Sequence, residues 1–251
     1  MIRAFLWLAA CLLPAPAVAC RLALALALDV SGSVDQQEYR LQVEGLADAL
    51  IDPEVQDALF AMPEVPVALA VYEWSSSTYQ RMIAGWTLID SPETLAGLSA
   101  HVRGWTREPA PEATGIGAAL EYGRDLLAAN PGCWKETLDI SGDGKNNDWP
   151  VPRELRRVGS IAGMRVNALV ISREVEGNGQ VIPLEVGELS AYFQAEVIQG
   201  PDAFVEVALG FQDYARAMKR KLLRELATQP LGKAPSGPAA VERLARRDSD
   251  Q

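Results

Sequence analysis

Short continuous runs of apolar residues alternate along the chain with segments whose apolar residues recur every three or four positions. A continuous run is typical of a strand buried on both faces, and three- to four-residue spacing is typical of an amphipathic helix. The predicted strands are 22–28, 65–74, 80–89, 136–140, 164–172 and 196–198. The predicted helices are 35–51, 92–102, 114–129, 152–162, 188–193 and 203–226. Strands that alternate with helices predict a three-layer α/β domain, with a mostly parallel central sheet and helices on both faces.

The two ends of the chain differ in composition from the segment between them. A positively charged start, an apolar run over 4–13 and Ala17-Val-Ala19 are typical of a secretory signal peptide, which we place at 1–19. The segment 228–251 is rich in Pro, Gly, Ala and charged residues, so we expect a disordered tail. One folded domain, 20–227, lies between them. The signal predicts an exported protein, either periplasmic or secreted.

The 251-residue chain carries a net charge of −10 and 49% hydrophobic residues. This hydrophobic content is sufficient for a sizeable core. No Lys- and Arg-rich stretch interleaved with aromatic residues is present, so we expect no binding to nucleic acid. Pro14, Pro16 and Arg21 interrupt the first apolar stretch, and we expect no stable membrane span once the signal is removed.

Two cysteines remain after the signal, Cys20 and Cys133, each at the start of a predicted strand. If these strands are parallel neighbours, the two sulfur atoms start level, about 5 Å apart, which is within reach of a disulfide. An oxidising compartment allows such a bond. The alternative is a lipoprotein with Cys20 as its lipid-bearing first residue, because Ala17-Val-Ala-Cys20 loosely resembles a lipoprotein signal. That site lacks the usual leucine at its start.

Oxygen-bearing side chains follow the ends of two predicted strands and open one predicted helix. Asp29, Ser31 and Ser33 stand at every second position where the first strand ends, so they point to one side of an extended backbone. Thr114 opens a helix, and Asp143 follows the fourth strand. In open α/β sheets, sites form at the carboxyl ends of the strands, so these loops meet if the first and fourth strands are neighbours. Such an oxygen-rich site suits a hard cation such as Mg²⁺, which takes six oxygen ligands and keeps some of them as water.

The motifs that carry these residues are D-V-S-G-S, T-G-I-G-A-A-L and, after an apolar strand, S-G-D-G. In this order and at these separations, they resemble the metal-ion-dependent adhesion site of the von Willebrand factor A (VWA) domain family. The resemblance covers residues 22–226. The phrases D-V-S-G-S-V-D and I-S-G-D-G-K-N-N also resemble an exported bacterial branch of that family. A VWA-type, Rossmann-like fold is what this resemblance implies.

The resemblance also implies a role for each of the five residues. Ser31 and Ser33 would bind the metal directly, and Asp29 and Asp143 mainly through water. Thr114 would join or leave the metal as the site switches. The implied ion is Mg²⁺, with Mn²⁺ or Ca²⁺ as alternatives, and the sixth ligand is often a carboxylate of a partner protein. We therefore expect a metal-dependent protein-binding module whose partner presents an acidic side chain, and not an enzyme.

One motif departs from the family pattern. Ser141-Gly142 stand where Thr-Asp-Gly is commoner, which affects the choice of the second acid. We prefer Asp143 to Asp139, because a glycine follows Asp143 whereas Asp139 lies inside the predicted strand. Thr106 is the alternative threonine, but no helix-opening Gly-x-Gly follows it.

Two other functions compete with the binding module: a metal-dependent hydrolase of the phosphoester class, and a scaffold whose metal site is unused. A hydrolase needs a nucleophile or a water-activating base, and commonly two metals. Ser31 stands where a phosphoryl-transferring D-x-D motif would have its second acid. The chain also has no G-x-S-x-G, H-E-x-x-H or phosphate-loop motif. An unused site is disfavoured because all five ligand types are present.

Four further side chains are candidates for the rim around the metal. They are Trp105, Glu108, Glu112 and Trp149. His101, the only histidine, lies in a predicted helix, and we expect it to be structural or solvated rather than catalytic.

Overall fold

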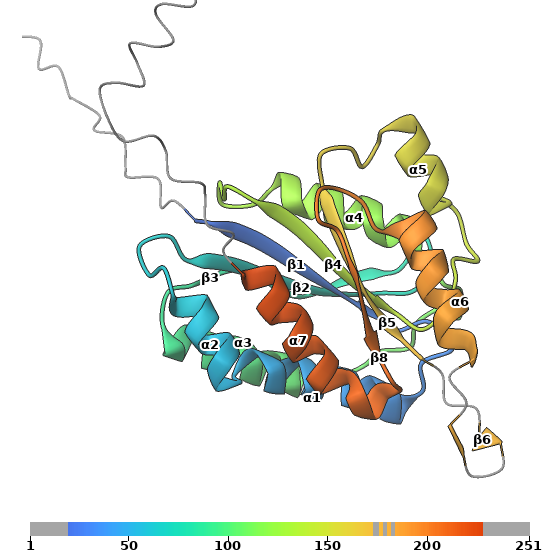
Figure 1. The fold of residues 1–251 in the computed structure, drawn as a ribbon, viewed down its shortest axis with the longest axis horizontal. Coiled ribbons are helices and arrows are strands. Elements are labelled where there is room, and N and C mark those ends of the chain that lie inside the picture. The colour runs from blue at the N-terminus through green and yellow to red at the C-terminus, as the bar shows by residue number, and fades with distance from the viewer. Residues whose placement is uncertain (1–19, 173–175, 178–179, 182–183, 228–251) are drawn as a thin grey trace, which may run out of the picture.

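The computed structural model describes residues 20–172, 176–177, 180–181 and 184–227. The predicted signal peptide and tail lie outside the described residues. The strands of the main sheet are β1 (Leu22–Asp29), β2 (Val67–Trp74), β3 (Gln80–Ile89), β4 (Glu136–Gly142), β5 (Arg165–Ile171) and β8 (Val205–Ala208). Within the described residues, their order is β3-β2-β1-β4-β5-β8, and β3 alone runs antiparallel to its neighbour (Figure 1). The prediction of a mostly parallel α/β sheet is confirmed.

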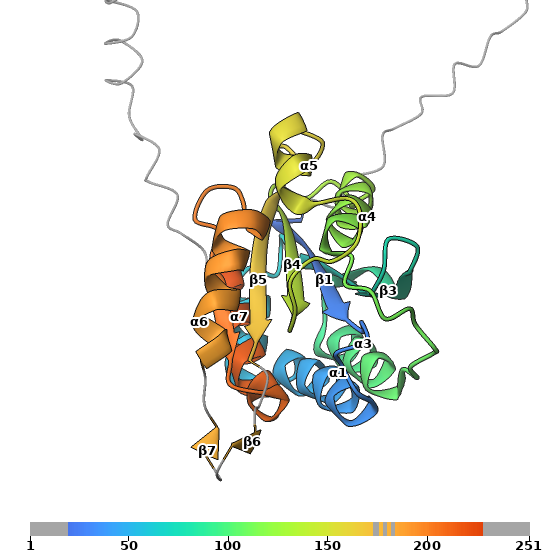
Figure 2. The same cartoon turned by 90° about the vertical axis from the view of Figure 1, so that its right-hand side faces the viewer.

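Helices cover both faces of this sheet, as Figure 2 shows around β1. One face packs against α1 (Gln36–Leu50), α2 (Pro53–Phe60), α3 (Pro92–Gly104) and α7 (Tyr214–Leu226). The other face packs against α4 (Ile116–Ala128), α5 (Pro152–Val158) and α6 (Leu184–Tyr192). A small hairpin of β6 (Glu176–Gly177) and β7 (Gln180–Val181) precedes α6. The predicted three-layer arrangement is therefore present.

The alternation of leucine and alanine in β1 assigns its side chains to the two layers. All eight residues of the strand are buried. The leucines pack in the core with α1, α3 and α7, and the alanines pack in the core with α4. Because alanine is small, α4 can approach the sheet closely, and a Cβ placed on its Gly123 would lie 2.6 Å from a methyl carbon of Leu138 in β4. The side chains of β1 therefore determine how closely the helices of each layer approach the sheet.

The start of α1 is fixed by a reciprocal pair of hydrogen bonds. The Asp35 carboxylate accepts from the Glu38 N–H (2.8 Å), and the Glu38 carboxylate accepts from the Asp35 N–H (2.8 Å). This capping box satisfies two N–H groups that otherwise lack partners at a helix start. It also fixes the end of the short loop that runs from β1 to α1.

The sequence prediction of one helix over 203–226 is wrong in its first part. Val205–Ala208 form strand β8, which pairs in parallel with β5, and Phe211–Asp213 form a 3₁₀ turn before α7 begins. Phe204, Phe211, Tyr214 and Met218 fit a helical spacing, but the open edge of β5 offers main-chain partners to the first of these segments. The hydrogen bonds of the sheet outweigh the local helical pattern.

Three smaller predictions also need correction. The predicted strand 196–198 is wrong, because Phe193–Val197 form a π-helical turn that continues α6. Helix α5 ends at Val158 rather than at 162, because Gly159 adopts a left-handed conformation (φ 75°) and caps it. The helix α2 was not predicted, although Asp52 caps it through the Glu54 N–H and a proline opens it.

Cys20 and Cys133 form the predicted disulfide at the start of β1 and β4. Their Cα atoms are 4.4 Å apart, and the two residues form a parallel bridge that precedes the β1–β4 ladder. The Cys20 sulfur atom is thereby used in this bond, so the lipid-bearing alternative is not supported. Among the described residues, no helix is long and apolar enough to cross a membrane.

A buried ion cluster joins α7 to the sheet. The Lys221 ammonium lies 2.9 Å from the Asp139 carboxylate on β4 and 3.0 Å from the Glu225 carboxylate, and all three side chains are almost completely buried. Asn167 of β5 donates to Glu225 (2.7 Å), and the ring of Phe204 lies 4.7 Å from the ammonium. Burial raises the pKa of Asp139, and the adjacent Lys221 opposes that shift. One cation thus compensates two carboxylates.

We predict that Lys221→Met lowers the free energy of unfolding by about 3–5 kcal/mol, because it leaves two buried carboxylates without a cation. Without Lys221, nothing opposes the effect of burial on Asp139, and its pKa in the folded variant lies above that in the unfolded chain. The folded state therefore loses stability as the pH rises from about 4 toward neutrality. The deficit is therefore smaller at pH 5 than at pH 8 in urea unfolding. The matched control is Lys219→Met, which removes a surface ion pair with Asp52 and Glu54 and has a much smaller effect. Equal losses in both variants contradict this account.

We predict that replacing both Cys20 and Cys133 with alanine lowers the free energy of unfolding by about 2–5 kcal/mol, because the bond closes a long loop in the unfolded chain. The separation along the chain is 113 residues. Thiol titration of exported protein gives no reactive cysteine before reduction and two after reduction in denaturant. Two reactive thiols in unreduced protein rule out the disulfide.

Candidate metal centre

The loop from β1 to α1 carries three of the predicted site residues. Asp29 is the last residue of β1 and is completely buried. Its Oδ1 atom accepts a hydrogen bond from the Ser31 N–H (2.8 Å), so the carboxylate turns the chain as the strand ends. The Gln42 side chain on α1 donates to the Asp29 carbonyl oxygen (2.8 Å). Ser33 follows at the surface end of the loop, just before α1.

The five predicted site residues lie together at the carboxyl edge of the sheet. The Ser33 hydroxyl donates to the Asp143 carboxylate (2.5 Å), and the hydroxyl oxygens of Ser31 and Ser33 are 3.4 Å apart. The Thr114 hydroxyl donates to the Ser31 hydroxyl oxygen (3.4 Å). With the Asp29–Ser31 bond, these contacts connect all five residues, although they come from three distant segments. Parallel pairing of β1 with β4 brings the first and third segments to the same edge.

The cluster contains two carboxylates, Asp29 and Asp143, that are almost completely shielded from water. Burial raises the pKa of Asp29 to about 7, and the nearby negative charge of Asp143 adds to the shift. The Asp29 Oδ2 atom is buried and has no hydrogen-bond partner among the described residues. A buried carboxylate oxygen without a partner is unusual and calls for an explanation such as a bound cation.

The residues present fit a hard divalent cation. Carboxylate and hydroxyl oxygens are the ligands that Mg²⁺, Mn²⁺ and Ca²⁺ take, and two carboxylates balance the charge of such an ion. Among the described residues, no group of three or more His, Cys, Asp or Glu could hold a metal ion. In the five-residue cluster, three of the five donors are hydroxyls. The arrangement is therefore suited to magnesium chemistry and not to a zinc site rich in cysteine and histidine.

The segment that precedes Thr114 forms hydrogen bonds with residues 30–34, which carry Ser31 and Ser33 and are called the serine loop below. The Arg107 guanidinium donates to the carbonyl oxygens of Val30 (3.1 Å) and Val34 (2.7 Å), on either side of the two serines. The Gly32 N–H donates to the Glu112 carbonyl oxygen (2.9 Å), and a Cβ at Gly32 would lie 2.8 Å from the Glu112 Cβ. A glycine is therefore needed at this close approach. Hydrogen bonds to main-chain groups thus hold the loop, and the serine hydroxyls themselves bond to Asp143, to Thr114 and to each other.

The alternative site residues lie in other surroundings. Asp139 pairs with Lys221 inside the domain, on the side of β4 that faces α7. Thr106 lines a separate cavity of about 490 Å³ between β3 and α3. His101 also lines that cavity, and its Nε2 atom is 2.8 Å from the Ile83 carbonyl oxygen.

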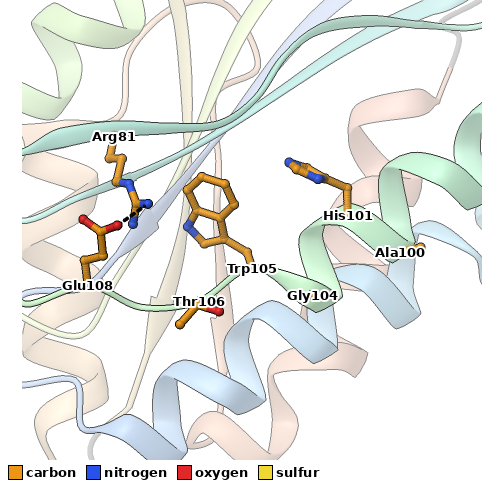
Figure 3. Close-up of a pocket in the computed structure, with 7 residues that line it drawn as sticks. All are labelled: Arg81, Ala100, His101, Gly104, Trp105, Thr106 and Glu108. Atoms are coloured by element: carbon orange, nitrogen blue, oxygen red, sulfur yellow. Dashed lines mark ion pairs between the residues drawn. The ribbon is translucent and has the colours of Figure 1, made fainter.

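Figure 3 shows this cavity, which is separate from the candidate metal centre and is called the second cavity below. The Trp105 ring lies between Arg81 and His101, with the guanidinium 4.5 Å from the ring centre. Arg81 also pairs with Glu108 (2.6 Å). Trp105 and Glu108, two of the predicted rim residues, thus line the second cavity. Of the other two, Glu112 touches the serine loop, and Trp149 is 68% exposed in the loop after Asp143.

A buried glutamate beneath the second cavity was missed by the sequence analysis. The Glu73 side chain is completely buried on β2 and accepts hydrogen bonds from the hydroxyls of Tyr39 (2.9 Å) and Tyr79 (2.9 Å) and from the Trp105 indole (3.3 Å). Burial and the Glu73 charge raise the pKa of both tyrosines. The signal in the sequence is the single acid within the apolar run VALAVYEW. Because its oxygens are satisfied inside the protein, this cluster supports the fold.

Comparison with solved structures places the fold among VWA domains. Proximal thread matrix protein 1 from the mussel byssus matches with a TM-score of 0.57 and 14% identity, over 82% of this chain and 48% of that chain. The pilus adhesin SpaC from Lactobacillus rhamnosus GG matches with a TM-score of 0.54 and 14% identity, over 82% and 30%. A von Willebrand factor type A protein from Catenulispora acidiphila matches with a TM-score of 0.55 and 15% identity, over 84% and 44%. This chain thus spans less than half of each of these chains.

At these identities, the likeness establishes the fold alone, which is VWA-like. A further structure of the mussel protein is described as having a zinc-occupied metal-ion-dependent adhesion site (MIDAS) motif, at 15% identity and a TM-score of 0.54. No curated protein matches this chain. One family model, "Protein of unknown function (DUF1194)", matches residues 19–230. The chain therefore belongs to the DUF1194 family, and its domain has a VWA-like fold.

Proposed function

We propose that this protein is an exported binding module that holds a divalent cation and uses it to bind an acidic side chain of a protein partner. The ion is Mg²⁺, or Mn²⁺ or Ca²⁺ in its place. The residues that would hold it are Asp29, Ser31, Ser33, Thr114 and Asp143. When bound, the cation would act as a Lewis acid that accepts a partner carboxylate.

One observation carries this proposal: hydrogen bonds connect five oxygen-bearing side chains from three segments, and one of the five, Asp29, has a buried Oδ2 atom without a hydrogen-bond partner in the described structure. The three hydroxyl groups carry no charge. The negative charge of the site is therefore that of its two carboxylates, which equals the positive charge of a divalent ion. A six-coordinate Mg²⁺ surrounded by five protein groups has room for one more oxygen ligand, which a carboxylate can supply. A partner with an exposed Asp or Glu is the ligand that this chemistry favours.

The names of the structurally similar proteins support a binding function. Two of the matched proteins are named as a thread matrix protein and a pilus adhesin, and the mussel protein has a form with zinc at its MIDAS motif. None of these names describes an enzyme. The disulfide between Cys20 and Cys133 supports export, because such bonds persist in oxidising compartments.

We predict that Mg²⁺ or Mn²⁺ at about 100 times its Kd raises the Tm of the mature protein by about 5–10 °C, since binding to the folded state alone adds about 2.7 kcal/mol. Asp29→Ala and, separately, Ser31→Ala abolish the rise, because each removes a proposed ligand or its support. Differential scanning calorimetry measures the shift. The matched control is Asp125→Ala, an exposed acid on α4, which keeps it. The same rise in Asp29→Ala as in wild type removes the metal site from this account.

We predict that metal-loaded protein retains a partner from the exported fraction of its host, and that Asp143→Ala or a chelator releases it. The expected loss follows because the partner carboxylate would bind the ion itself. Surface-bound wild type, Asp143→Ala and Asp125→Ala are compared with and without Mg²⁺, and the retained proteins are quantified by mass spectrometry. Retention that ignores both Mg²⁺ and Asp143 contradicts a metal-mediated contact.

A further inference from the structure

The loop that follows Asp143 holds Thr114 through two hydrogen bonds to one residue. The Thr114 N–H donates to the side-chain oxygen Oδ1 of Asn147 (2.7 Å), and the Asn147 N–H donates to the Thr114 carbonyl oxygen (3.0 Å). Both bonds join the threonine segment, which is Thr114 and the first turn of α4, to the loop that carries Asp143. Thr114 therefore cannot move away from this loop unless both bonds break.

The residues on either side of Asn147 extend the connection to two other elements. The Asn146 side-chain oxygen accepts from the Gly117 N–H (3.2 Å) in the first turn of α4. The N-cap of that helix is Gly115, which has no side chain to accept such a bond, so Asn146 takes over this capping role. The Asp148 carboxylate accepts from the Ser77 N–H (2.7 Å) in the loop after β2. Three consecutive side chains thus bind main-chain N–H groups of two neighbouring segments.

Close packing removes the remaining freedom of the threonine segment. The Gly115 N–H donates to the Ser75 carbonyl oxygen (2.6 Å), and a Cβ on Gly115 would lie 2.7 Å from the carbonyl carbon of Ser76. A Cβ on Gly117 would overlap the carbonyl oxygen of Pro150. The start of α4 is therefore enclosed between the loop after β2 and the loop after β4. Thr114 itself is 5% exposed.

We propose that Asn147 is a positioning residue for the metal centre, which holds Thr114 so that its hydroxyl stays beside the Ser31 hydroxyl. This inference rests on the proposed function and assigns a role to a residue outside the five candidate ligands. Here the threonine segment and the Asp143 loop form one unit.

The first test measures Mg²⁺ affinity of the mature protein by isothermal titration calorimetry. Asn147→Ala removes the acceptor of the Thr114 N–H and should weaken Mg²⁺ binding about three- to tenfold. Asn147→Asp keeps an oxygen acceptor and should bind Mg²⁺ at least as tightly as wild type. The matched control is Asn130→Ala, which also removes an asparagine oxygen that accepts main-chain N–H groups, but beside Cys133. That variant should keep the wild-type Kd.

A double-variant comparison separates positioning from a general effect on folding. In a Thr114→Val background the proposed ligand is already absent, so adding Asn147→Ala should leave the Kd unchanged. If Asn147→Ala weakens Mg²⁺ binding by the same factor in both backgrounds, or leaves wild-type affinity intact, the positioning role is overturned.

Amide hydrogen exchange tests the contact without any metal. Loss of the Asn147 oxygen should speed exchange of the Thr114 N–H about three- to tenfold. Unchanged exchange at Thr114 overturns the inference even when the wild type binds Mg²⁺. If exchange responds as expected but the wild type binds neither Mg²⁺ nor Mn²⁺, the proposed function fails and the metal role of Asn147 fails with it, whereas the link between the two loops stands.

Discussion

The parallel pairing of β1 with β4 is the interaction on which the rest of the structure depends. Its register places Ala23 opposite Glu136 and continues to Ala27 opposite Ile140, so both strands end at the same edge. A shift of two residues would move Asp143 about 7 Å along the strand direction and away from the serine loop. The disulfide at the start of both strands links the same pair covalently. The register of one strand pair thus brings together the acidic residues of the site.

The composition of β1 determines how closely each helical layer approaches this pair. Its leucines fill the core beneath α1 and α7, while its alanines leave room for α4 to lie close to the sheet. Because α4 lies so close, its first turn comes within hydrogen-bond distance of the loop after β4, and Thr114 comes next to Ser31. The packing of α4 therefore positions the Thr114 hydroxyl, and the register of β1 with β4 positions the two acids.

Hydrogen bonds to main-chain groups join the segments of the candidate site. Arg107 and Glu112 hold the serine loop, and Asn147 holds Thr114. Groups that are already in place lose little conformational freedom when a ligand binds, which favours affinity. The relatives share this fold at 14–15% identity, so the proposed function depends on these residues and their oxygens rather than on the likeness of the chains.

The sequence by itself determined the α/β class, the central strands and the cysteine pair, because each leaves a local signal in apolar runs or spacing. It also supplied the motifs whose five side chains lie together, while their role toward a metal stays a prediction. Only the tertiary structure decided that Val205–Ala208 is a strand, that Lys221 neutralises Asp139, and that Asn147 holds Thr114. A sequence pattern records spacing along one segment, whereas these outcomes depend on which distant segment offers the hydrogen bond or the charge.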